Sequence, residues 1–267
     1  MGEGKECSVQ SFLFSSKESW RLYSSEYRAS KVWRIFYLLW RWCWAIFFIS
    51  YVIFSVAADH SWYFNENQRV KWFIYMTNWG ILAFTIAQLV NAIVSTIGLT
   101  IPESSEEVKW YMKLNWVLYE FSCAETIVIS IMFWSLLYYD GYPLSIDTYV
   151  DHGVNGLHVL LDIWITAMPI KALHFYLPAL FGLSYVIFTI IYDYGGGTNA
   201  QLDSYIYSLL DWSESPKNAA IYSAGAILAV IAVHFILFGL FKFKIFLYKR
   251  AATGSRVNLQ VVPLAEN

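Results

Sequence analysis

The sequence predicts an all-α integral membrane protein, a bundle of six transmembrane helices with both termini in the cytoplasm. Of its 267 residues, 58% are hydrophobic, 19% are aromatic and only 14% are charged. A soluble domain carries about 25% charged residues, so this chain has too few to cover a water-exposed surface. Its net charge of -2 also provides no basic surface for nucleic acid. We therefore expect membrane lipid as a partner and no nucleic acid.

Six segments are long and apolar enough to cross a bilayer, which takes about 20 mostly apolar residues. They cover approximately residues 35–58, 72–99, 116–139, 153–169, 175–192 and 220–247. The segment at 153–169 is the shortest and the most polar of the six. These bounds divide the chain into a polar leader (1–34), a membrane domain (35–247) and a basic tail (248–267). Both ends are short and polar, so we expect them to be flexible.

The orientation follows from the positions of Lys and Arg, which gather on the cytoplasmic side of membrane proteins. One set of connections carries most of them: Lys17, Arg21, Arg28, Lys31, Arg34, Lys109, Lys113, Lys171, Lys242, Lys244, Lys249 and Arg250. The connections predicted on the other side are acidic, with Lys217 as an isolated cation in the longest of them. Only Arg69 and Lys71, in the first connection, argue the other way. Both termini are therefore predicted to be cytoplasmic.

Polar side chains occur at membrane depth in three of the predicted spans. Because such groups are costly in hydrocarbon, each needs a partner, a cavity or a function. Helical spacing places His152, Asn155, His158 and Asp162 on one face of the fourth span. That face must turn inward, towards the polar face of the second span. The predicted polar core contains Asn78, Gln88, Asn91, Glu120, Glu125 and Asn155.

Three interpretations of these polar residues remain open on the sequence alone. They form a hydrogen-bonded core that fixes helix packing, or a catalytic pocket in which a threonine hydroxyl is activated by a neighbouring base, or a metal or proton site. His158 and Asp162 are suitable ligand types, but the chain has no strict metal motif such as HExxH. We accordingly expect no metal ion and no cofactor.

Several motifs together resemble the rolling stone family. They are FIYMTNWG (73–80), LNWVLYE (114–120), DHGVNGLHVLLD (151–162), HFYLPALFGLSYVIFTIIY (174–192) and YIYSLLDW (205–212). The resemblance covers nearly all of the chain from the leader to the sixth span. It implies a multi-pass protein of the plasma membrane, rather than of the endoplasmic reticulum, associated with myoblast fusion in muscle development. The family brings no biochemical activity with it.

The chain is more distantly similar to the androgen-induced membrane threonine hydrolases, which cleave fatty acid esters of hydroxy fatty acids. Thr77 in FIYMTNWG falls where these enzymes have their nucleophile. Their catalytic histidine falls on Asn155, whose amide has no useful basicity. The resemblance therefore implies Thr77 as the nucleophile. His152 or His158 would replace the missing base, and Asp162 would orient it. It leaves open whether this chain is an enzyme.

The preferred functional prediction is a non-enzymatic protein acting in a cell-surface or developmental process such as cell fusion. Its protein partner at the cell surface is not identified by the sequence. The first alternative is an intramembrane hydrolase of fatty acid esters, with a lipid substrate in the bundle interior and Thr77 as nucleophile. The second is a small transporter with a proton relay of His, Asp and Glu side chains. Against transport, the chain shows no internal repeat.

Overall fold

The computed structural model describes residues 12, 14–16, 18–58, 66–102, 107–140 and 144–260, without the side chains of 66, 67 and 252–260. Within these ranges the fold is all-α, and the β structure is limited to an isolated bridge between Ser25 and Thr166. The first eleven residues of the predicted leader and the last seven of the predicted tail lie outside the described residues.

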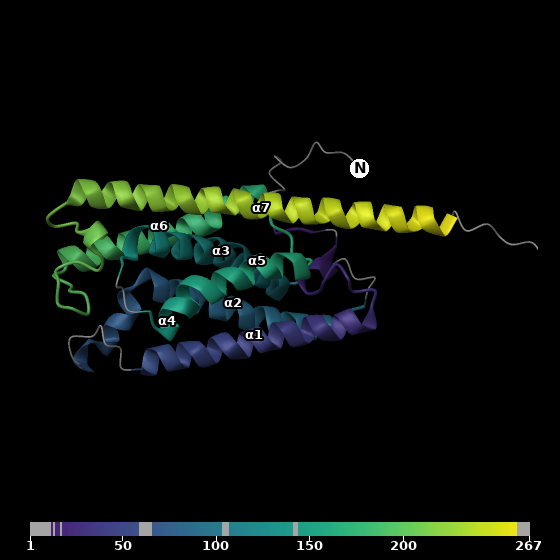
Figure 1. Cartoon of the computed structure of the whole chain (residues 1–267), viewed down its shortest axis with the longest axis horizontal. Coiled ribbons are helices and arrows are strands. Elements are labelled where there is room, and N and C mark those ends of the chain that lie inside the picture. Colours follow the sequence, from purple (N-terminus) through teal and green to yellow (C-terminus); the bar gives the residue numbers. More distant parts are fainter. Residues whose placement is uncertain are drawn as a thin grey trace, which may run out of the picture.

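Five long helices dominate the structure and run lengthwise side by side (Figure 1). They are α1 (Lys31–Ala57), α2 (Met76–Gly98), α3 (Trp110–Met132), α6 (Tyr176–Tyr194) and α7 (Pro216–Gln260). Each is long and apolar enough to cross a membrane by its length and composition. The chain is therefore a multi-pass membrane protein.

The predicted fourth span differs from the other five. It consists of α4 (Ile146–Tyr149), a π-helical turn η5 (Val150–Val154) and α5 (Asn155–Ile165), which follow one another without a break. Because the helix type changes along this run, none of its parts alone is long enough to span a bilayer. Figure 1 shows the run lying obliquely across the middle of the bundle. A sixth membrane crossing here stays a prediction.

Two sequence-based expectations about the ends of the chain need correction. The leader was expected to be flexible, yet η2 (Ser19–Leu22) packs on the bundle, and Leu22 is fully buried. Asn115 Nδ2 donates to the Leu22 carbonyl at 3.0 Å, which holds this part of the leader against α3. The predicted tail from residue 248 begins as helix, since α7 continues through Gln260. No proline interrupts that helix before Pro263.

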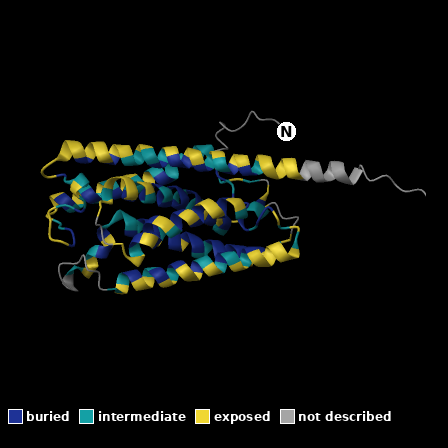
Figure 2. Cartoon of the chain, in the orientation of Figure 1, coloured by how far each residue is buried: buried dark blue, intermediate teal, exposed yellow. Residues whose placement is uncertain are grey.

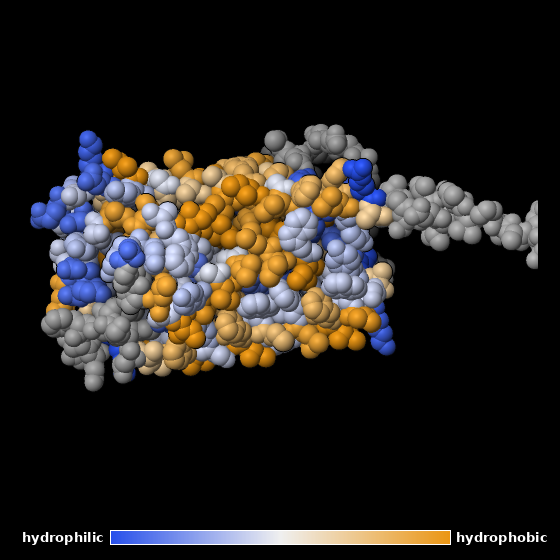
Figure 3. Space-filling view, viewed as in Figure 1, coloured by the Kyte–Doolittle hydropathy of each residue, from blue (hydrophilic) through white to orange (hydrophobic). Residues whose placement is uncertain are grey.

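The bundle has an apolar outer surface, as lipid contact requires. On α1, Leu39, Ile46 and Ile53 are exposed at intervals of seven residues and so share one face. Figure 2 shows exposed residues along the outer faces of the helices, and Figure 3 shows apolar residues over the middle of the molecule with polar residues nearer its ends. The interior is filled by aromatic side chains, among them Phe48, Phe84 and Trp116.

Shorter elements close the two ends of the bundle. At one end η3 (Glu66–Ile74), η4 (Phe133–Leu137) and η7 (Ser208–Leu210) lie near the start of α2 and α7. Lys71 Nζ donates there to the Thr198 carbonyl at 2.7 Å, which joins two distant connections. At the other end, the leader lies beside residues 166–171 and η6 (Ala172–Phe175). The basic connections named above gather at this second end.

Candidate functional site

Three separate places in the structure contain residues singled out in the sequence. We call them the Thr77 pocket, the Arg41 cluster (Arg41, Trp40, His158, Asp162) and the Glu120 clamp (Glu120, Lys171, His174). The candidate nucleophile lies in the first, two of its three proposed partners lie in the second, and His152 belongs to none of them.

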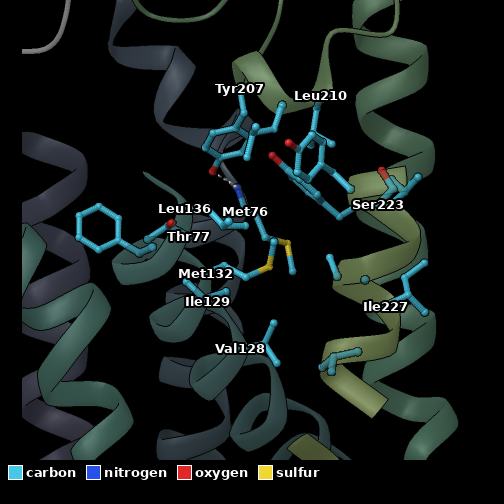
Figure 4. A pocket seen from close by; sticks show the side chains of 18 of the residues that line it. Met76, Thr77, Val128, Ile129, Met132, Leu136, Tyr207, Leu210, Ser223 and Ile227 are labelled. Carbon is cyan, nitrogen blue, oxygen red and sulfur yellow. Dashed lines mark hydrogen bonds between the residues drawn. The ribbon is translucent and has the colours of Figure 1, made fainter. Parts of the chain in front are cut away.

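The Thr77 pocket is an apolar hollow between α2, α3, α6, α7 and η7, with an empty volume of about 880 Å³ that includes space open to the outside. Thr77 is the second residue of α2, and its side chain is half-buried. Figure 4 shows Tyr207 and Leu210 at one end of the pocket, Val128 at the other, and Thr77 between them near Leu136. Ser223 and Ile227 lie on the facing wall, which α7 provides.

Tyr207 covers Thr77 but cannot activate it. Its hydroxyl accepts a hydrogen bond from the Met76 amide at 3.0 Å and also interacts with Thr77. Burial raises the pKa of Tyr207 to about 12, so its phenol stays protonated near neutral pH. A general base must accept the threonine proton, and this group does not do so.

His152 lies behind the pocket wall. Its ring stacks on Phe133 with 3.7 Å between ring centroids and an angle of 2° between the planes. Phe133 lines the pocket, whereas His152, Asn155, His158 and Asp162 are all absent from its lining. Among the described residues, no hydrogen bond that the structure shows joins Thr77 to any of these four.

Asp162 and His158 both belong to the Arg41 cluster. Arg41 Nη1 donates to Asp162 Oδ1 at 2.7 Å, and Trp40 Nε1 donates to the same oxygen at 2.8 Å. Arg41 is fully buried, and Asp162 is 1% exposed. The His158 ring stacks on Trp44 at a centroid distance of 4.5 Å and contacts Phe84. These contacts join α5 to side chains of α1 and α2, away from Thr77.

Sequence analysis missed Arg41. It lies in the first predicted span, where the run LWRWCW places an arginine among apolar residues. An arginine at membrane depth calls for an acidic partner, and that requirement could have paired it with the aspartate of the fourth span. Arg41 is part of neither the basic connections nor the polar core that the sequence analysis describes.

The six residues of the predicted polar core are all buried. Two of them bond locally: Asn78 Nδ2 donates to the Trp72 carbonyl at 2.6 Å, and Asn155 Nδ2 donates to the Asp151 carbonyl at 2.8 Å. The side-chain oxygens of Gln88 and Asn91 have no partner among the described residues. The Asn155 side chain is thus bonded within its own helical run.

The Glu120 clamp holds the connection between α5 and α6. Glu120 Oε1 accepts from the Lys171 amide at 2.7 Å, and its other oxygen pairs with His174 Nδ1. Trp116, one turn before Glu120 on α3, donates from Nε1 to the Pro169 carbonyl at 2.7 Å. The two glutamates of α3 therefore differ: Glu120 is tied to a connection, while Glu125 lines the Thr77 pocket.

A metal site has no support in the part of the chain that the structure describes. Within it, no group of three or more His, Cys, Asp and Glu side chains is placed to hold a metal ion. His158 and Asp162 do lie together, but Asp162 is bonded to Arg41 and His158 is enclosed by aromatic rings.

Comparison with known proteins gives consistent matches over almost the full length. A family profile described as "Protein rolling stone" matches residues 3–258. The Drosophila melanogaster protein named "Protein rolling stone" is 30% identical over 253 residues, which cover 90% of this chain and 89% of that protein. No solved structure matches. The chain belongs to the rolling stone family.

Proposed function

We propose that this chain is a non-enzymatic membrane protein that acts at the cell surface in a developmental process such as myoblast or cell fusion. Family membership supports the rolling stone type. The observation that carries the non-enzymatic part is the separation of Thr77 from the proposed bases. His158 and Asp162 are held in the Arg41 cluster, and His152 is stacked behind Phe133. Nucleophilic catalysis needs the base within hydrogen-bond reach of the hydroxyl.

The alternative, an intramembrane hydrolase of fatty acid esters with Thr77 as nucleophile, draws on one specific feature. Thr77 borders an apolar pocket that also contains a buried carboxyl group, Glu125. Glu125 precedes Val128 by three residues on α3, so it lies about one helical turn further from Thr77 than Val128 does. Thr77 lies nearer the opposite end, which argues against direct proton transfer.

Complementation by a threonine variant separates the two functions. In fusion-competent cells whose own copy is disrupted, we expect fusion to fall and to be restored equally by the parent and by Thr77→Ala. Removing one hydroxyl leaves the bundle contacts intact, so both should reach the same surface level. Normal fusion in the disrupted cells would refute the fusion role. Rescue by the parent alone, together with fluorophosphonate labelling that Thr77→Ala abolishes, would establish the hydrolase instead.

We further propose that the chain crosses the plasma membrane six times, with both termini in the cytoplasm. The run 146–165 is helical throughout, 20 residues in length from its bounds, and extends along the bundle (Figure 1). At about 1.5 Å per residue it reaches about 30 Å, the thickness of the hydrocarbon core. The end of the bundle with the leader and residues 166–171 carries the basic connections, as a cytoplasmic face requires.

A further inference from the structure

The Thr77 pocket contains a polar group that no contact within the protein explains. Glu125 is 3% exposed, and its Oε1 atom has no hydrogen-bond partner among the described residues. An unsatisfied buried carboxyl oxygen destabilises a folded chain, because it gives up its bonds to water without replacing them. Glu120, five residues earlier on the same helix, has two partners. Glu125 is therefore available to a molecule that enters the pocket.

A second polar atom in the pocket is also unpartnered. The hydroxyl of Ser223, on α7, is buried and lacks a hydrogen-bond partner among the described residues. The remaining lining is almost entirely apolar or aromatic, and it includes no Lys, Arg or His among the described residues. An apolar hollow with a few polar groups is the usual form of a small-molecule site.

The pocket reaches the outer surface of the molecule. Leu136 and Tyr222 both line it and are both exposed, at 49% and 39%. These two residues belong to η4 and α7, whose outer faces are predicted to meet lipid. A molecule from the bilayer can therefore enter with its chain still in contact with neighbouring lipids.

We propose that the Thr77 pocket binds an uncharged long-chain alcohol or an equivalent single-chain lipid, whose hydroxyl bonds to Glu125. The apolar middle of the pocket binds the hydrocarbon chain of this lipid. A fatty acid or phosphate head group is unsuitable, because the lining offers a carboxyl group and no cation. A charged amine would leave an ion pair in an apolar site, where the cost of desolvating both charges can exceed their attraction. This inference concerns binding alone and does not depend on the role in fusion.

Three probes with the same chain and different head groups test the head-group preference. They are hexadecanol, palmitic acid and hexadecylamine, each with a diazirine within the chain and a terminal alkyne. With the parent protein in lipid nanodiscs, we expect the alcohol probe to label residues of α3, α6 or α7 that line the pocket. Labelling by the acid and the amine should be about tenfold weaker, the ratio that loss of one buried hydrogen bond gives. Stronger labelling by either charged probe would overturn the proposal.

Two variants test the site itself. Glu125→Leu should lower labelling by the alcohol about tenfold, while Glu125→Gln, which keeps an acceptor, should remain near the parent. Gly182→Leu should fill the pocket beside Glu125 while keeping the carboxyl group in the chain, since a Cβ at Gly182 would contact Glu125 Oε1 at 3.7 Å and Ile227 Cγ1 at 4.0 Å. Labelling of Gly182→Leu at the parent's level, or mapped outside the lining, would refute the site. That variant and the probe comparison decide the matter even where Glu125→Leu fails to fold.

Discussion

Replacing Asp162 by leucine is expected to lower the free energy of unfolding by about 3–5 kcal/mol, which is the cost of breaking a buried ion pair by removing one partner. Arg41 would keep its charge in a site where it is fully buried. Two bonds would be lost at once, those from Arg41 Nη1 and Trp40 Nε1 to Asp162 Oδ1. We expect a lower melting temperature in detergent and reduced surface expression. An Asp162→Leu protein as stable as the parent would contradict the assignment of this pair.

The double variant Arg41→Leu with Asp162→Leu is the matched control. With both charges gone, no uncompensated ion remains, so most of the stability lost in Asp162→Leu should return. Arg41→Leu alone should also be destabilised, because Asp162 would then be the buried charge without an ionic partner. If the two single changes simply added in the double variant, the residues would not act as a pair.

Replacing Glu120 by leucine is the second change with a large expected effect. The Lys171 amide and the ring of His174 would both lose an acceptor, and the His174 side chain is fully buried. Each buried group left without its bond costs about 1–3 kcal/mol. We expect a total loss of about 2–6 kcal/mol in unfolding free energy, measured by thermal unfolding, together with easier proteolysis of the connection at residues 166–175.

Glu120→Gln serves as the control for that change. Glutamine keeps one acceptor oxygen, so the bond from the Lys171 amide can persist and the loss of stability should be smaller than in Glu120→Leu. Equal stability of the leucine variant and the parent would show that the clamp does not fix the connection.

The sequence predicted five of the spanning helices because long apolar runs carry a strong signal. The bounds of α1, α2 and α6 agree with the predicted spans to within a few residues. The fourth span was harder to predict, because it is short and carries a polar stripe. Neither feature indicates that the helix type changes within it. The π turn at Val150–Val154 has no clear sequence pattern and arises from packing, including the stack of His152 on Phe133.

The grouping of the polar residues could not be obtained from the sequence. Periodicity showed that His158 and Asp162 share a helix face, and the structure does bring them together. It could not show that the face meets Arg41 and Trp44 rather than Thr77, because that depends on how α1, α2 and α5 are packed. Similarly, Glu120 and Glu125 looked alike in sequence. Their different roles follow from neighbours more than 50 residues away, such as Lys171 and Gly182.

The central claim, a bundle of six crossings with both termini in the cytoplasm, is tested most directly by the accessibility of epitopes in intact cells. One epitope is inserted at Gly196, where φ is 75° and a Cβ would meet nothing within 4 Å. Others are placed at each terminus. The account predicts antibody binding to the Gly196 epitope on intact cells, and binding to both termini only after permeabilisation. One terminus accessible on intact cells and the other protected would mean an odd number of crossings, and would contradict the account.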